Sequence, residues 1–140
     1  MTIADTVLDP VKVAAQAAAD KQGRDVVAFD VSEQLAITDI FLIATGRNER
    51  HVGAIVDAIE ESLLKIGWKP LRREGDRENR WVLLDYVDFC VHVQHPEERS
   101  LYNLERLWKD CPQIALDIQQ PEPSDHDEWA DDADELPAGW

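Results

Sequence analysis

The sequence is poor in cysteine and contains no long apolar run. Its two cysteines, Cys90 in an apolar stretch and Cys111 beside Pro112, lack the cysteine framework of a secreted domain, so unpaired thiols are expected. No stretch approaches the roughly 18 apolar residues of a membrane-spanning helix. The start, MTIADTVLDP, has neither the basic region nor the apolar core of a signal peptide. We therefore expect a soluble, cytoplasmic protein without a membrane partner.

Basic residues are also scarce, and residues 119–140 contain none. Eight acids lie in that segment, so −8 of the formal net charge of −15 belongs to it and −7 to the rest. Such acidity argues against sequence-specific nucleic-acid binding, which depends on cationic contacts to phosphates, and favours a basic protein partner. Prolines and acids with few core-forming residues predict a disordered acidic tail over 119–140. We divide the remaining length into an N-terminal extension, 1–8, and one domain, 9–118.

The sequence also lacks a recognisable metal or cofactor motif. Cys90 and His92 share a face of a predicted strand and His95 is close by, but no further ligand stands at a zinc spacing. A nucleophilic pair of Cys90 with His92 or His51 is disfavoured because burial in a strand raises the pKa of a thiol. Gly46 alone is a weak signal for a phosphate-binding loop. We expect no metal and no cofactor.

Helix and strand patterns alternate along the chain and predict a single α/β domain with a mixed, roughly five-stranded sheet packed by helices. Asp9 and Pro10 open the first predicted helix, and Asn48 caps the second, which ends at Gly67. Charged residues 73–80 are expected to form a flexible link. The predicted elements before this link are a helix over Pro10–Lys21, central strands over Asp25–Val31 and Ile37–Thr45, a helix up to Ile66, and an edge strand over Trp68–Arg72.

The stretch from Trp81 to Trp108 organises the rest of the chain. Two apolar runs, Trp81–Leu84 and Phe89–Val93, flank a short acidic turn and predict an antiparallel hairpin. Alternation places Trp81, Leu83 and Asp85 on one face, and likewise Cys90, His92 and Gln94. After Pro96 the apolar spacing changes to three and four, which predicts a helix bearing Leu101, Leu104 and Trp108. The run Ile114–Ile118 can add a further apolar contact.

These residues resemble the ribosomal silencing factor family, also called RsfS or Iojap. The matching features are Trp81 at the start of a strand, the turn from Asp85 to Asp88, the VHV strand around His92, the stretch TDIFLIATG with Arg50 and His51, and the run Arg99, Tyr102, Leu104, Glu105, Leu107 and Trp108. The resemblance covers roughly Asp9 to Asp110. The sequence departs from the family at Val87, where the family usually has glycine. A turn that needs a positive φ angle favours glycine and disfavours valine.

The resemblance implies a nucleotidyltransferase-like fold and a translational repressor rather than an enzyme. Family members bind ribosomal protein L-fourteen on the large subunit and block joining of the small subunit when nutrients are limiting. It points to a partner-binding set of Trp81, Asp85, His92, Arg99, Tyr102 and Trp108, although Leu104 and Trp108 could equally be core. A homodimer stays open. The alternative is a nucleotidyltransferase-type enzyme, but Gly46-Arg47 replaces the Gly-Ser turn of those enzymes and Asp85 and Asp88 are spaced three apart.

Overall fold

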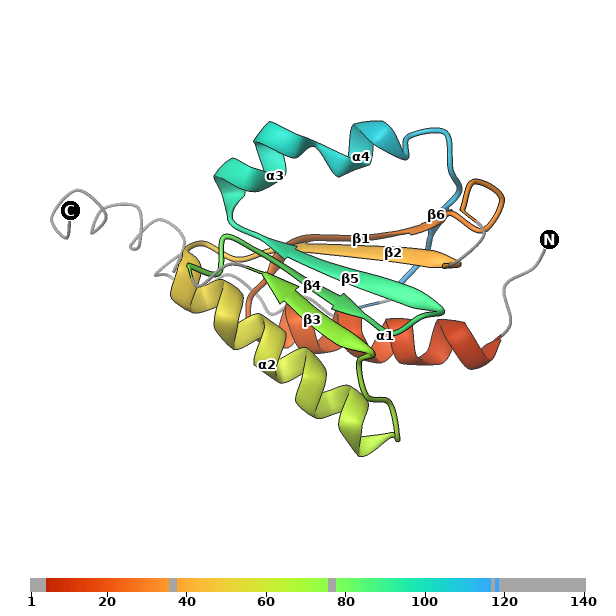
Figure 1. The fold of residues 1–140 in the computed structure, drawn as a ribbon, viewed down its shortest axis with the longest axis horizontal. Coiled ribbons are helices and arrows are strands. Elements are labelled where there is room, and N and C mark those ends of the chain that lie inside the picture. The colour runs from red at the N-terminus through yellow and green to blue at the C-terminus, as the bar shows by residue number, and fades with distance from the viewer. Residues whose placement is uncertain (1–4, 36–37, 76–77, 117, 119–140) are drawn as a thin grey trace, which may run out of the picture.

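The computed structural model describes residues 5–35, 38–75, 78–116 and 118. These residues form a six-stranded mixed sheet in the order β3-β4-β5-β2-β1-β6 (Figure 1). Only β2 and β5 pair in parallel, and the other neighbours are antiparallel. The predicted α/β class and mixed sheet are confirmed, with one strand more than expected. The strands are β1 (Arg24–Asp30), β2 (Ile40–Thr45), β3 (Arg72–Gly75), β4 (Trp81–Asp85), β5 (Phe89–Gln94) and β6 (Gln113–Ile114).

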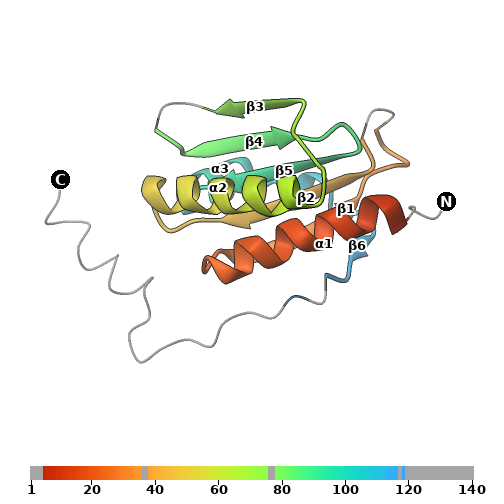
Figure 2. The ribbon, with the colours of Figure 1, turned by 90° about the horizontal axis from the view of Figure 1, so that it is seen from below.

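The helices cover the two faces of the sheet unequally. The long helices α1 (Asp5–Asp20) and α2 (Glu49–Lys65) lie side by side on one face, as Figures 1 and 2 show. The short helices α3 (Pro96–Tyr102) and α4 (Leu104–Leu107) lie over the other. We call these the α1–α2 face and the α3–α4 face. Two short helices cover less sheet than two long ones, so part of the α3–α4 face stays open.

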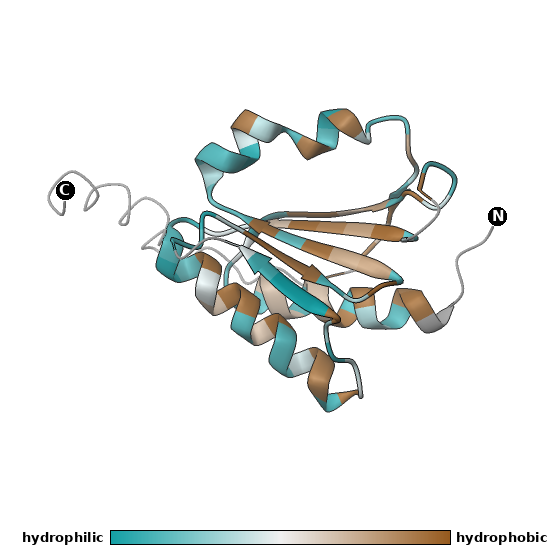
Figure 3. Ribbon diagram, in the orientation of Figure 1, coloured by the Kyte–Doolittle hydropathy of each residue, from teal (hydrophilic) through white to brown (hydrophobic). Residues whose placement is uncertain are grey.

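The hydrophobic core has two parts, one on each face of the sheet. The larger cluster packs α1 and α2 against one side of the strands, with Val11, Ile59 and Leu42 fully buried. The smaller cluster, on the α3–α4 face, contains Phe29, Val31, Ile43 and Leu104. Figure 3 shows apolar inner strands and a polar β3 at the sheet edge. Leu104 is thus a core residue, as one of the two sequence readings held.

Helix α1 begins earlier than predicted. Asp9 and Pro10 were expected to open it, but the helix already includes Asp5 and carries Pro10 in its interior. Proline there removes one backbone hydrogen bond, which costs a helix about 3 kcal/mol. Val7 is buried and Leu8 packs against the same core, and this apolar contact stabilises the additional turn. The sequence signal for a first-turn proline was therefore misleading.

The predicted second helix is confirmed as α2. The Asn48 side chain accepts a hydrogen bond from the backbone N–H of His51 at 2.8 Å, and Gly67 follows the helix with a φ of +90°. The ring of His51 is buried and links the helix start to its surroundings. Its Nδ1 accepts from the N–H of Arg47 at 2.9 Å, and its Nε2 lies 2.6 Å from the carbonyl of Lys21. His51 is therefore a structural link between the ends of α1 and α2.

The edge strand lies further along the chain than predicted. The expected strand Trp68–Arg72 is wrong, and β3 occupies residues 72–75 of the supposed flexible link. This segment pairs with β4, and its charged side chains suit an exposed edge that must not bind other strands. Arg73 also reaches Glu60 of α2 at 2.6 Å. Pro70 stays outside the strand, where its missing N–H does no harm.

The hairpin of β4 and β5 is confirmed, with Trp81 opposite Gln94 and Asp85 opposite Cys90. Its turn keeps the geometry that glycine favours, because Val87 has a φ of +71°. The N–H of Asp88 bonds the carbonyl of Tyr86 at 2.8 Å and closes the turn around Val87. Valine is branched at Cβ, so this conformation is strained.

The predicted helix after Pro96 is broken in two. Asn103 adopts a left-handed conformation, with a φ of +42°, and ends α3. Its side chain then accepts from the N–H of Arg106 at 3.2 Å and so caps α4. Asparagine tolerates this conformation better than most residues do. The break leaves Leu101 exposed while Leu104 is buried, so the predicted apolar stripe is interrupted.

The central strands β1 and β2 confirm the two predicted apolar runs. Asp39, which the sequence placed inside the second run, instead precedes β2 and is half-buried. Its backbone N–H donates to the carbonyl of Asp88 at 2.9 Å.

Leu116 is buried in the larger cluster, which confirms an apolar contact after α4. The predicted N-terminal extension falls partly within α1, and the predicted tail, 119–140, lies outside the described residues.

Candidate partner-binding surface

The residues that the sequence placed on shared strand faces lie together on the α3–α4 face. Trp81 packs with the smaller cluster, whereas its neighbour Val82 belongs to the larger one. Strand register then sets Leu83 opposite His92 and Asp85 opposite Cys90. Trp81, Leu83 and His92 also border a pocket of about 260 Å³ beside the β3 edge. The strand pattern therefore predicted the grouping within each strand, and the register of the hairpin brings the two groups together.

Trp81 and Tyr102 form an aromatic pair at the margin of this face. Their ring centroids are 4.8 Å apart, with the planes at 46°. Trp81 is half-buried, whereas Tyr102 is about half exposed, at 52%. A strand and a helix thus present adjacent aromatic rings to solvent, which is the composition typical of interface anchors.

His92 lies beneath this pair rather than on the surface. Its side chain is 7% exposed, and burial lowers the pKa of its imidazole to about 4, so the ring is neutral at pH 7. The indole N–H of Trp81 donates to Nδ1 at 3.1 Å, which places the imidazole proton on Nε2. Among the described residues Nε2 finds no hydrogen-bond partner. His92 therefore orients Trp81 and makes no exposed contact in this structure.

Asp85 is engaged within the protein as well. One carboxylate oxygen accepts the N–H of Val87 at 2.8 Å, and the other lies 3.3 Å from Nε of Arg72. These contacts fix the hairpin turn and join β3 to the end of β4. The acid is the turn former that its position in the sequence indicated.

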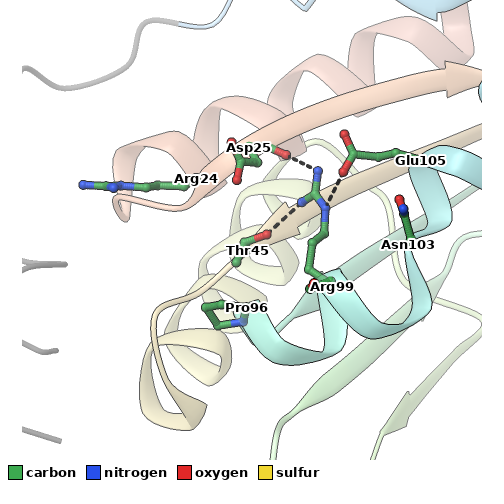
Figure 4. Close-up of a pocket in the computed structure, with 8 residues that line it drawn as sticks. Arg24, Asp25, Thr45, Pro96, Arg99, Asn103 and Glu105 are labelled. Carbon is green, nitrogen blue, oxygen red and sulfur yellow. Dashed lines mark hydrogen bonds and ion pairs between the residues drawn. The ribbon is translucent and has the colours of Figure 1, made fainter.

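Arg99 holds α3 and α4 against the sheet. Its guanidinium donates to the hydroxyl of Thr45 and the carbonyl of Asp25, each at 2.8 Å, and to Glu105 at 2.9 Å (Figure 4). Only 8% of Arg99 is exposed. A pocket of about 400 Å³ lies beside it, but Glu105 compensates the charge. Arg99 therefore positions the two helices.

Trp108 lies on the inner side of α4. Its ring meets Phe41 edge-on at 5.2 Å, and the smaller cluster packs around it. Its indole N–H has no partner among the described residues. Of the six predicted binding residues, the structure brings Trp81, His92, Tyr102 and Trp108 together, while Asp85 and Arg99 make internal ion pairs.

Sequence reasoning missed several apolar residues that this face exposes. Leu71 and Val87 are exposed at the hairpin end, and Leu101 and Leu107 are exposed on α3 and α4. An apolar residue is ordinarily assigned to the core, so no pattern in the sequence marked these four as surface. Leu101 and Leu107 are exposed because the chain breaks at Asn103 between α3 and α4, whereas Leu71 and Val87 lie at the edge strand and in the hairpin turn.

Within residues 72–80, the arginines that the structure describes, Arg72, Arg73 and Arg80, all lie close to acids. Arg73 pairs with Glu60, and Arg80 lies 2.9 Å from Glu98 and 3.1 Å from Glu49. Hydrogen bonding to Glu98 raises the pKa of Arg80 further. The described arginines of this segment therefore form no open basic patch for phosphates.

The environment of the two cysteines does not favour a reactive thiolate. Both are unpaired and half-buried, and burial raises the pKa of the Cys90 thiol. No group of three His, Cys, Asp or Glu side chains in the described parts of the chain could hold a metal ion. Within the same residues, no helix has the length and hydropathy needed to cross a membrane.

Gly46 has a packing role that explains its presence. A Cβ at this position would lie 2.8 Å from the backbone nitrogen of Val52, so any larger residue would push α2 away from β2. This close approach accounts for the glycine without a phosphate ligand. The resemblance to nucleotidyltransferases stays a prediction from sequence.

The fold and this surface define a small α/β domain with a half-covered sheet face edged by aromatic rings. A family model, "Ribosomal silencing factor during starvation", matches residues 4–138. The ribosomal silencing factor RsfS of Bacillus subtilis is 42% identical over 107 residues, which cover 76% of this chain and 91% of that protein. The chain belongs to the ribosomal silencing factor family, as its sequence motifs indicated.

Solved structures agree with this assignment. A crystal structure from Chromobacterium violaceum has a TM-score of 0.70 and 30% identity, covering 81% of this chain and 88% of that one. Another, from Bacillus halodurans, has a TM-score of 0.67 and 36% identity, covering 80% and 99%. The similarity therefore extends over nearly the whole α/β domain.

Proposed function

We propose that this protein binds the large ribosomal subunit through ribosomal protein L-fourteen, blocks association with the small subunit and so represses translation under nutrient limitation. Membership of the ribosomal silencing factor family supports the regulatory role. We place this activity in the cytoplasm and assign it no catalytic step.

The observation that carries the choice of surface is the Trp81–Tyr102 pair at the open margin of the α3–α4 face. Large aromatic side chains dominate the free energy of many interfaces, particularly where they close over an apolar centre. The net charge of −15 adds attraction to a basic protein. An acidic domain with aromatic anchors therefore suits a ribosomal protein better than it suits bare RNA.

In this proposal the six predicted residues have different roles in binding the partner. Trp81 and Tyr102 would contact the partner, and Trp108 would support them from below. His92 and Arg99 would act by holding Trp81 and α3 in place, since both are buried. Asp85 would shape the turn beside the contact surface.

Sedimentation with separated ribosomal subunits tests the proposal directly. The protein should sediment with large subunits without added nucleotide, and large subunits loaded with it should fail to join small ones. Sedimentation with small subunits alone, or unchanged joining, would contradict the proposal. The mass of the free protein in the same experiment shows whether a homodimer precedes binding.

The enzyme alternative has its own decisive measurement. Turnover of a nucleoside triphosphate that disappears when Asp85 or Asp88 is replaced by asparagine would establish a nucleotidyltransferase. We expect no turnover, because Asp85 is occupied by Arg72 and by the turn.

A further inference from the structure

A second apolar feature lies on the α3–α4 face, at the opposite end of β4 from Trp81. A groove of about 250 Å³ opens at the hairpin tip, bordered by Leu35, Phe41, Leu71, Arg72, Val87 and Cys90. We call it the hairpin groove. Its outer walls, Leu71 and Val87, are 65% and 50% exposed. Leu71 and Val87 each bury too little apolar area within the domain for a contribution to folding stability alone to explain an apolar residue at that position.

Val87 is the less expected of the two walls. Its φ of +71° is costly for a side chain branched at Cβ, and glycine would adopt it without strain. Half of the side chain faces solvent, so contacts within the domain compensate little of this cost. An exposed apolar group in a strained conformation is a reason to look for a contact outside the domain.

The charge around the groove indicates what would fill it. Asp85 borders the groove, and Asp39 and Asp88 lie beside the same tip, joined by the hydrogen bond between their backbones. Arg72 is the basic residue of the lining and already pairs with Asp85 at 3.3 Å. The rim therefore keeps a negative excess, which attracts a segment that carries lysine or arginine.

We propose that the hairpin groove receives an apolar side chain from a basic segment of the partner protein, with Val87 and Leu71 as its walls. This rests on the proposed function, and it adds a second anchor to the aromatic pair. Trp81 and Asp85 lie on the same strand and face, about 13 Å apart at the rise of an extended chain. One extended segment of the partner can therefore reach both anchors.

The test is Val87→Gly, measured for thermal unfolding and for binding to large subunits. Strain relief should leave the melting temperature equal to or above that of the parent, while loss of the side chain weakens binding about five- to tenfold. Val87→Asn should behave alike, because asparagine tolerates positive φ but offers a polar side chain. Opposite effects on stability and binding distinguish a contact residue from a structural one.

Matched controls come from the same chain. Gln22→Gly puts glycine at another position of positive φ, +66°, in the turn that follows α1, and should leave binding unchanged. Leu71→Asp should weaken binding at least tenfold, whereas Leu64→Asp, at a position on α2 that is 54% exposed, should not.

Three outcomes overturn the proposal. Parental affinity in both Val87 variants removes the groove as an anchor, and if Trp81→Ala still weakens binding, the proposed function stands alone. If Leu64→Asp and Leu71→Asp weaken binding to large subunits equally, the hairpin groove makes no specific contribution to binding. Failure of the parent to bind large subunits rejects the proposed function itself, and the groove with it.

Discussion

Trp81 and His92 are joined across the β4–β5 hairpin by a hydrogen bond of 3.1 Å from the indole N–H to Nδ1 of the imidazole. The bond requires a ring with a free lone pair at Nδ1, which a protonated imidazole lacks. The orientation of the half-buried Trp81 ring thus depends on the charge state of a buried residue. This link makes both the stability of the domain and the proposed contact surface sensitive to acid.

The first prediction concerns pH. The folded pKa of His92, about 4, lies below its unfolded value of 6.5, so the unfolded chain binds more protons between these values. The stabilisation is complete above pH 6.5 and is lost progressively as pH falls towards 4. We expect the free energy of unfolding to drop by about 2 kcal/mol between pH 8 and pH 5 from this residue.

Urea unfolding of the parent and of His92→Gln over pH 5–8 measures this contribution. The variant is less stable at pH 8, and its stability should depend less steeply on pH. Parallel curves for the two proteins would show that His92 does not titrate in this way.

The second prediction separates the ring of Trp81 from its N–H group. Trp81→Ala removes a half-buried ring that also packs at a tilt against Tyr102, and should cost about 2 kcal/mol of stability and about 2 kcal/mol or more of binding. Trp81→Phe keeps an aromatic surface but loses the hydrogen bond, so it should cost about 1 kcal/mol of stability and little binding.

Chemical denaturation and subunit sedimentation on both variants give the two quantities independently. Full binding by Trp81→Ala would remove this residue from the contact surface. A much larger loss of stability would instead assign the ring to the core.

The third prediction concerns Arg99. Arg99→Ala leaves the hydroxyl of Thr45, the carbonyl of Asp25 and the carboxylate of Glu105 without their donor, and should destabilise the domain by about 3 kcal/mol. Arg99→Lys keeps the charge but not the planar fork, so it should recover less than half of the loss.

The exposed Arg106, on α4, supplies the control, because Arg106→Ala should change the free energy of unfolding by less than about 0.5 kcal/mol. Equal effects of Arg99→Ala and Arg106→Ala in urea would contradict the positioning role.

The fourth prediction concerns residues 119–140. Their composition indicates a segment that buries little apolar area, so its deletion should leave the melting temperature unchanged within about 1 °C. Differential scanning calorimetry of the full chain and of residues 1–118 makes the comparison. A fall of several degrees would show that the segment packs on the domain.

The sequence predicted those elements whose local pattern and tertiary environment agree. The β4–β5 hairpin and α2 follow directly from their apolar period and caps. The position of β3 could not be predicted, because charged residues form a strand there only through pairing with β4 and contact with α2. Asn103 looked like an ordinary helical residue until its left-handed conformation separated α3 from α4.

The candidate surface shows the same limit. Alternation grouped Trp81 with Leu83 and Asp85, and separately His92 with Cys90 and Gln94. The contact of His92 with Trp81 depends on the register of the hairpin, and its packing against Phe41 depends on β2, which comes from outside the hairpin. Arg99 resembled a surface arginine because two of its three partners, Thr45 and Asp25, come from distant segments, and only Glu105 is near it in sequence. Local patterns carry no information about such long-range hydrogen bonds.

The parallel pairing of β2 with β5 has a consequence for synthesis of the chain. It joins residues roughly fifty positions apart, such as Ile40 and Phe89, and contacts of that span form late because a long loop must close first. The α3–α4 face uses both strands and the helices that follow them. We therefore expect the proposed contact surface of a nascent chain to form only when nearly the whole domain has left the exit tunnel of the ribosome that is making it.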